Sequence, residues 1–263
     1  MKHRLWIAVG LTLMESALTA APLNYSENFN SWGETWLELS PSATTDYWYR
    51  NEGALVGGTT WGPGGVGGTK WMWAVSDGWA PQVFNGNVYR NFRTAGTLAA
   101  TESITNATLT AYVRNGTGSD GDSALYDRLS LLDNVGNGYV GTIDRAGGMS
   151  LYKSAAGTLT SIGTNASEVS GNTKYCTLSV INDVVTLSYY YDGSPLTVYT
   201  TTAADGTYDA FTTLALGGHY GYWEGLGYDN VTLTGATVIP EPATAGLLVV
   251  AGALALMRRR KQG

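Results

Sequence analysis

The chain has 263 residues, a net charge of −6 at pH 7, and a single cysteine. This length suits one large all-β domain that can fold without disulfide bonds, and one cysteine excludes an internal disulfide. The acidic balance excludes attraction of nucleic acid through bulk charge. Cys176 alternates with Leu178 and Val180, which predicts a buried thiol on an apolar strand face.

The N-terminal residues predict a secretory signal peptide. Lys2 and Arg4 precede an apolar run over residues 5–13, and small residues follow at 17–21. We expect cleavage after Ala20, so that residues 1–20 are removed and the remaining chain is exported.

The C-terminal segment, residues 238–263, differs from the body in composition. Pro240 and Pro242 lack amide donors and end any preceding strand. Residues 243–257 carry no charge, and as a helix they would span roughly 22 Å, less than the ~30 Å hydrocarbon core of a bilayer. A basic cluster follows, which is typical of a cytoplasmic flank and favours a membrane helix over one packed on the body. It consists of Arg258, Arg259, Arg260 and Lys261.

The order Pro240-Glu241-Pro242, apolar helix and basic end resembles the PEP-CTERM sorting signal of Gram-negative bacteria. The resemblance implies processing at Pro-Glu-Pro by an exosortase, a membrane-embedded transpeptidase-like enzyme, while the basic end stays cytoplasmic. It further implies an intermediate anchored in the inner membrane, followed by location at the cell surface or in the exopolysaccharide matrix. Residues 240–242 and 258–261 would then be substrate elements for another enzyme.

Residues 21–237 show short runs of alternating apolar and polar side chains and no sustained helical periodicity. Such runs flank turn residues at 136–138, 155–157 and 182–183. Many short strands at this spacing predict an antiparallel two-sheet sandwich.

The first and last predicted strands each carry a carboxylate among apolar neighbours. Glu27 shares a face with Tyr25, and Asp229 is expected to share a face with Val231 and Leu233. Because an unpaired buried charge costs several kcal/mol, both carboxylates need partners.

The opening segment Glu27-Asn28-Phe29 and the closing segment, residues 227–233, resemble those of concanavalin A-like (laminin G-like) jelly rolls. The resemblance implies that the first and last strands pair side by side. It also implies a structural Ca²⁺ with Glu27 and Asp229 as ligands. The alternative is that Asp229 accepts hydrogen bonds from backbone amides or an arginine.

Seven tryptophans lie between residues 32 and 79. Aromatic rings with nearby polar groups hold sugars by stacking on their apolar faces, which predicts a polysaccharide-binding surface. The residues expected to form it are Trp61, Trp71, Trp73 and Trp79; the alternative is that they fill the core. His219 and Trp223 form a second, weaker candidate.

Residues for catalysis are scarce in this chain. His219 is the only histidine after signal cleavage, which excludes two-histidine metal sites, and no Gly-x-Ser-x-Gly motif occurs. The acidic triplet of jelly-roll glucanases is also absent, and Asp120, Asp122 and Asp127 are expected in a solvated turn rather than a calcium loop.

The sequence therefore predicts a non-catalytic surface or matrix protein that binds polysaccharide. Two alternatives stay open: a secreted glycosidase or lyase with an unrecognised carboxylate arrangement, and a purely structural surface protein.

Overall fold

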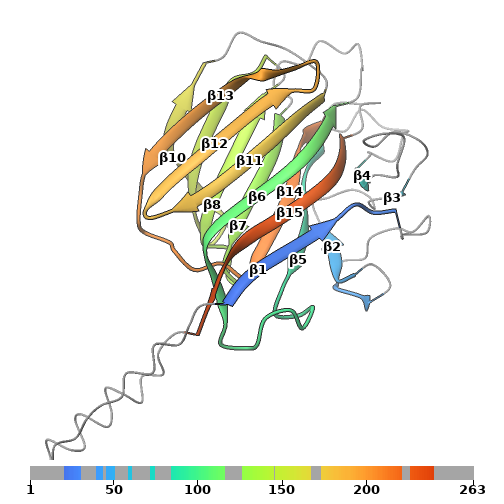
Figure 1. Ribbon diagram of the computed structural model, residues 1–263, viewed down its shortest axis with the longest axis vertical. Coiled ribbons are helices and arrows are strands. Elements are labelled where there is room, and N and C mark those ends of the chain that lie inside the picture. Colours follow the sequence, from blue (N-terminus) through green and yellow to red (C-terminus); the bar gives the residue numbers. More distant parts are fainter. Residues whose placement is uncertain are drawn as a thin grey trace, which may run out of the picture.

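Two antiparallel sheets pack face to face in this protein (Figure 1). The computed structural model describes residues 21–30, 40–43, 46–50, 59–60, 72–74, 84–115, 126–144, 146–166, 173–220 and 226–239. Among these residues the structure confirms the predicted all-β sandwich.

The eight-stranded sheet lies in front in Figure 1. Its order is β13 (Ser194–Ala204), β12 (Val184–Tyr191), β11 (Thr173–Ile181), β6 (Ser103–Asn115), β15 (Leu226–Val238), β4 (Met72–Ala74) and β3 (Thr59–Thr60), and β1 (Ala21–Glu27) also pairs with β15. The seven-stranded sheet has the order β10 (Thr158–Asn165), β9 (Met149–Ala155), β8 (Gly138–Asp144), β7 (Tyr126–Leu132), β14 (Thr213–Tyr220), β5 (Phe84–Asn91) and β2 (Trp48–Arg50).

Local turn chemistry explains the hairpins. Asn182 and Asp183 join β11 to β12 with φ angles of 49° and 64°, the left-handed conformation that a two-residue hairpin of the favoured twist requires. Asparagine and aspartate tolerate this region better than other residues with a side chain. The predicted hairpin is therefore confirmed.

Alternate residues of the strands fill one core between the sheets. Cys176, Leu178 and Val180 all point into it, and Cys176 is fully buried. Burial raises the pKa of the Cys176 thiol well above its usual range, since the charged thiolate is disfavoured there. The predicted buried cysteine is confirmed.

The first and last strands pair side by side, as predicted. Ala21 lies opposite Thr237, and Glu27 lies opposite Val231. The expected face of Asp229 is wrong, however, because the register of β15 against β6 shifts between Asp229 and Thr232.

The cause of this error is a β-bulge at Asn230, whose φ is 46°. A bulge inserts one extra residue, so that residues on either side of it no longer follow simple alternation. Asp229 lies opposite Tyr112 and Thr232 lies opposite Thr110, both on the outer face of the sheet, whereas Val231 belongs to the core.

The two ends of the sandwich differ. The pair Ala21 and Thr237 places the beginning of β1 and the end of β15 at one end, which we call the chain-end side (Figure 1). The opposite end of β15, at Leu226, pairs with Asn115, and we call this the far side. β14 ends at Tyr220, shortly before β15 begins at Leu226, so this end of β14 also lies at the far side. His219 of β14 lies opposite Tyr126, and β7 therefore begins at the far side as well.

Asp205 holds a polar cluster at the chain-end side. Lys153 forms an ion pair with it at 3.0 Å, and the Tyr139 hydroxyl donates to it at 2.8 Å. Burial alone would raise the pKa of Asp205, but hydrogen bonds from Thr207, Tyr139 and Lys153 outweigh burial and lower the pKa below its usual range.

No helix within the described ranges is long and apolar enough to cross a membrane. The predicted signal peptide, residues 1–20, and residues 240–263 of the predicted sorting segment lie outside these ranges.

Candidate functional site

The outer face of the seven-stranded sheet is unusually apolar at its centre. An antiparallel sheet with one face toward water normally alternates apolar and polar residues. Here β8 is buried at every position from Gly138 to Ile143, so both of its faces are covered. Leu132, Val140 and Ala215 form an apolar cluster separate from the main core.

Tyrosines pack around this outer cluster. Tyr89 and Tyr152 contact it, and the register places both in one row with Ala215 and Val140. Tyr49 extends the row, since its ring stacks on Tyr89 with the centroids 5.4 Å apart. Burial and the neighbouring Tyr89 raise the pKa of Tyr49, so its hydroxyl stays protonated. We call Tyr49, Tyr89 and Tyr152 with Ala215 and Val140 the aromatic row.

A polar network adjoins the aromatic row on its far side. The Arg128 guanidinium donates through Nη1 to Oδ1 of Asn87 at 3.2 Å and through Nη2 to the Tyr126 hydroxyl at 2.7 Å. Its Cζ also lies 5.3 Å from the centroid of the Tyr126 ring. Asn87 in turn donates through Nδ2 to the Tyr89 hydroxyl at 3.2 Å, which joins the network to the aromatic row. Asn87, Tyr89, Tyr126 and Arg128 are called the Arg128 network.

Gly217 lies between Asn87 and Arg128, the two members of this network on either side of β14. It lies opposite Asn87 on β5 and opposite Arg128 on β7. A Cβ at Gly217 would collide with the Gly86 carbonyl oxygen and lie 2.5 Å from Oδ1 of Asn87. A glycine is therefore needed here for close approach of β14 and β5.

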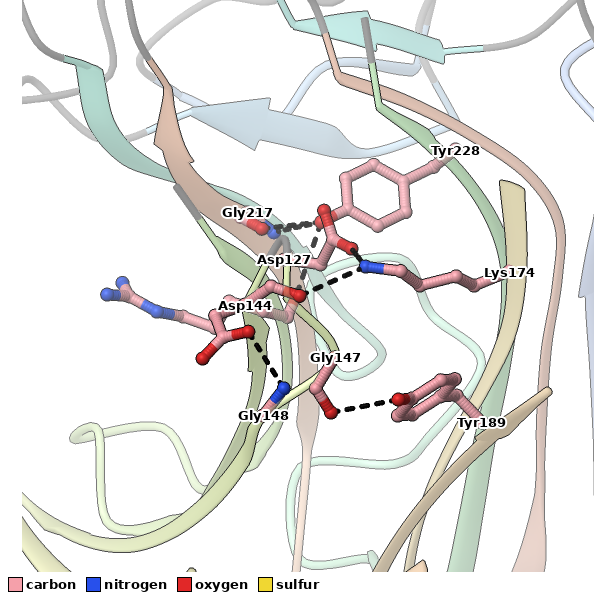
Figure 2. Close-up of polar contacts among 9 residues, drawn as sticks. Asp127, Asp144, Gly147, Gly148, Lys174, Tyr189, Gly217 and Tyr228 are labelled. Carbon is pink, nitrogen blue, oxygen red and sulfur yellow. Dashed lines mark hydrogen bonds and ion pairs between the residues drawn. The ribbon is translucent and has the colours of Figure 1, made fainter. Parts of the chain in front are cut away.

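A buried tyrosine supports these strands from the core side (Figure 2). The Tyr228 hydroxyl accepts a hydrogen bond from N–H of Gly217 at 3.1 Å and faces the carbonyl oxygens of Gly217 and Arg128. Because Tyr228 lies on β15 of the other sheet, it ties the backbone beneath the Arg128 network to the opposite layer.

A buried ion pair also joins the sheets, directly beside this contact (Figure 2). Nζ of Lys174 on β11 lies 3.2 Å from Oδ2 of Asp127 on β7, and it donates to the Asp144 carbonyl at 3.3 Å. Their side chains are 0% and 1% exposed. The expectation that Asp127 lies in a solvated turn is therefore wrong, and Asp120 and Asp122 lie outside the described ranges. Since Asp127 precedes Arg128, the ion pair fixes the backbone that carries the guanidinium.

This arrangement suits a ligand that combines hydroxyl groups with apolar ring faces. The Arg128 network supplies oriented donors and hydroxyls, and the half-buried rings of Tyr49, Tyr89 and Tyr152 supply apolar surface, whereas Val140 and Ala215 are buried. Among the described positions of this face, Asp144 is the only carboxylate, and its Oδ1 accepts the N–H of Gly148 at 2.8 Å. The arrangement on these strands is one of binding groups rather than of a facing carboxylate pair.

The predicted tryptophan surface falls mainly outside the described ranges. Trp61, Trp71, Trp79 and Trp223 all lie there, and for Trp73 only the backbone position in β4 is described, opposite Thr59 and Gly227. Their role in binding stays a prediction.

His219 occupies an informative position in the sheet. Its backbone lies opposite Tyr126 on β7 and opposite Asn85 on β5, so the register places it in the same row as Tyr126 of the Arg128 network.

The predicted calcium ligands lie on paired strands but have other neighbours. Oε1 of Glu27 accepts the N–H of Phe29 at 2.7 Å, and burial raises the pKa of Glu27. Oδ1 of Asp229 accepts the N–H of Asn230 at 2.7 Å, which is the alternative left open by the sequence. Among the described residues, no group of three or more His, Cys, Asp and Glu side chains could hold a metal ion. Calcium binding stays a prediction.

Solved structures that are similar in fold to this chain include lectins. No protein-family model matches the chain, and no curated protein matches its sequence. The chain is similar to peanut lectin with a 9mer peptide, at 12% identity and a TM-score of 0.50, over 82% of this chain and 99% of that one.

Two further structures match over similar lengths. Winged bean acidic lectin complexed with methyl-α-D-galactose is 8% identical with a TM-score of 0.48, over 82% of this chain and 100% of that one. The CBM2 module of the evolved Dit protein of Lactobacillus casei BL23 phage J-1 is 10% identical with a TM-score of 0.48, over 84% and 99%. Together with the two antiparallel sheets, the likeness to peanut lectin confirms the predicted concanavalin A-like jelly roll.

Sequence reasoning missed the Arg128 network. Its members lie on two strands 41 residues apart, and no motif links Asn87 to Arg128. The alternation of Tyr126 and Arg128 along one strand was the available signal, but alternation alone does not show which face is outward.

Proposed function

We propose that this is an exported surface or matrix protein whose jelly roll binds carbohydrate without transforming it. The Arg128 network and the aromatic row form the binding face. The observation that supports this most strongly is the second apolar cluster on the outside of a sheet, lined by tyrosines and bordered by an oriented guanidinium and amide.

The chemistry of this face fits a sugar better than a charged polymer. Asn87 and Arg128 already share a hydrogen bond, so their positions are fixed before a ligand arrives, which lowers the entropy cost of binding. Tyr89 offers both an apolar ring and a hydroxyl, the combination that recognises a sugar ring and its substituents.

The proposed sorting signal would set the orientation of the jelly roll at the membrane. The chain-end side carries the end of β15 at Val238, two residues before Pro240. A body held at the membrane by residues 243–257, and processed by an exosortase at 240–242, would present the far side and the Arg128 network outward. This orientation is useful for a protein that holds extracellular polysaccharide.

Binding is tested on a glycan array with the purified full chain. Wild-type protein should bind a defined subset of oligosaccharides. Arg128→Gln should weaken that binding about tenfold or more, because it removes one or two hydrogen bonds from a charged donor.

The matched control is Arg93→Gln. Arg93 is a half-buried arginine near the chain-end side, where its Nε donates to the Glu102 carbonyl at 2.8 Å. The Arg93→Gln substitution should leave binding unchanged. Equal binding by wild type and Arg128→Gln, with both proteins folded by circular dichroism, would contradict the proposed face.

Sorting is tested separately in cells. Deleting residues 258–261, or replacing residues 240–242 by alanine, should leave the jelly roll folded and change its processing or surface delivery. Unchanged mature protein at the surface in fractionation would contradict the exosortase proposal.

A further inference from the structure

The outer face of the eight-stranded sheet carries a lattice of hydroxyl groups. The register aligns one residue from each of six adjacent strands in a single row, and every one is serine or threonine. The row consists of Ser26, Thr232, Thr110, Thr177, Ser188 and Thr200. The next row, two residues along each strand, runs from Asn24 to Thr202 and has a hydroxyl at every position except Asn24.

These side chains are available to solvent. Each residue of both rows is exposed or half-buried. Thr110 and Thr177 lie close enough for their hydroxyls to share a hydrogen bond at 3.2 Å. Since strands lie about 4.8 Å apart and alternate residues about 6.8 Å apart, the rows form a regular grid of donors and acceptors.

Aromatic and apolar rows border this grid. Toward the far side, Tyr112, Tyr175 and Tyr190 form a registered row with successive ring centroids 4.9 Å apart. Toward the chain-end side, Ile181 and Val184 are 44% and 42% exposed. We call the two hydroxyl rows together with these two borders the hydroxyl face.

The hydroxyl rows contain no charged residue at any described position. The whole chain has a net charge of −6, but these two rows offer no charge to a partner, and this absence of charge decides which kind of partner they fit. A charged polymer finds no complementary charge in these rows, whereas an uncharged, hydroxyl-rich polymer finds hydrogen-bond partners and aromatic edges.

The size of the hydroxyl face argues against a second protein. Its seventeen residues, at about 33 Å² each on the strand spacings above, cover roughly 550 Å², whereas a stable protein interface needs about 800 Å² per partner. An extended sugar chain lying across the strands can use the grid in full, because one strand spacing is close to the length of one sugar unit.

We propose that the hydroxyl face is a second binding surface, for long uncharged polysaccharides. The outer faces of the two sheets point in opposite directions (Figure 1), so one molecule would hold one chain on the hydroxyl face and another on the Arg128 network. The protein would thereby cross-link polysaccharide. The cross-linking rests on the proposed carbohydrate binding at Arg128, but binding at the hydroxyl face does not.

The test uses full-length protein and a panel of suspended uncharged polysaccharides: microcrystalline cellulose, chitin, cross-linked dextran and galactan. Retention on the particles measures binding, and clumping of the particles measures cross-linking. Thr110→Val with Thr177→Val removes two central hydroxyls while keeping the side-chain shape and a high strand propensity. Thr160→Val, at an exposed threonine of β10 that belongs to neither hydroxyl row, is the control.

We expect wild type and the control to be retained by at least one member of the panel, with little dependence on salt because no ion pair is involved. The double valine variant should be retained about tenfold less well, since each lost hydrogen bond weakens binding by a factor of a few. It should also lose clumping while keeping its array signal through Arg128.

The other outcomes overturn the proposal. Retention equal in wild type and the double valine variant, or retention on no uncharged polysaccharide, shows that the face does not bind one. Loss of a dimer in the variant by light scattering assigns the face to self-association instead. Failure of Arg128→Gln to alter array binding, with the valine effect intact, refutes the Arg128 site and the cross-linking alone.

Discussion

Replacing Lys174 by methionine should be among the most damaging single changes in this protein. The substitution keeps the length and apolar stem of the side chain but removes the ammonium group from the ion pair with Asp127. Asp127 would then be a carboxylate with 1% of its side chain exposed that has lost its ion pair with Lys174.

The magnitude follows from burial and distance. Unit charges 3.2 Å apart attract by about 5 kcal/mol at the effective dielectric constant of about 20 that describes protein interiors. Removing one partner of a buried pair typically costs about 3 to 5 kcal/mol, because the other charge is left in a poorly solvated place. We therefore expect the free energy of unfolding to fall by about 4 kcal/mol.

The double variant Lys174→Met with Asp127→Leu is the informative companion. It removes both charges and replaces them with apolar groups of similar size, which is often neutral or even stabilising for buried pairs. Its free energy of unfolding should be within about 1 kcal/mol of wild type.

Urea denaturation of the full chain, followed by tryptophan fluorescence and circular dichroism, measures both values. A loss below about 1 kcal/mol for Lys174→Met would refute the reasoning, because it would mean that water solvates the remaining carboxylate. A double variant as unstable as the single one would show that packing, rather than charge, causes the loss.

Three further changes test other parts of the structure. Gly217→Ala should lower the free energy of unfolding by about 1 to 3 kcal/mol, since its Cβ meets the Gly86 carbonyl; an unchanged melting temperature would contradict this contact. Asp205→Asn should cost about 1.5 kcal/mol at pH 7, where the carboxylate is ionised and hydrogen-bonded. Because the folded state lowers the pKa of Asp205, this difference should shrink as the pH falls below about 4, and a difference that stays constant to pH 2 would contradict the sign. If Asp229 helps to bind Ca²⁺, a chelator should lower the melting temperature by several degrees, since a site at a hundredfold excess of ion adds about 2.7 kcal/mol. Asp229→Ala should remove that response, and a melt that is indifferent to chelator would refute calcium binding.

Local patterns predicted the parts of the fold that depend on neighbours in sequence. The hairpin at Asn182 and Asp183 and the buried face of Cys176 follow from turn chemistry and alternation, and the structure has both. The face of Asp229 could not be predicted in this way. One bulged residue, Asn230, reverses the alternation, and an asparagine within a strand is by itself not enough to locate a bulge.

Contacts between residues that are far apart in the sequence were the second feature that the sequence could not predict. Asp127 lies in a polar stretch of sequence, and its partner Lys174 is 47 residues away on the other sheet. The same holds for Asn87 and Arg128, which meet only because β14 lies between their strands. Residue types alone therefore pointed to the tryptophans, whereas the strand register brings together the tyrosine, asparagine and arginine side chains of the proposed binding face.

The position of a bound oligosaccharide tests the central proposal most directly. A crystal structure of the protein with the best oligosaccharide from the array should show a sugar ring against Tyr89 and hydrogen bonds to Asn87 or Arg128 on the outer face of β5 and β7. A sugar bound at the tryptophans between residues 61 and 79, with the Arg128 network untouched, would contradict the proposed binding face.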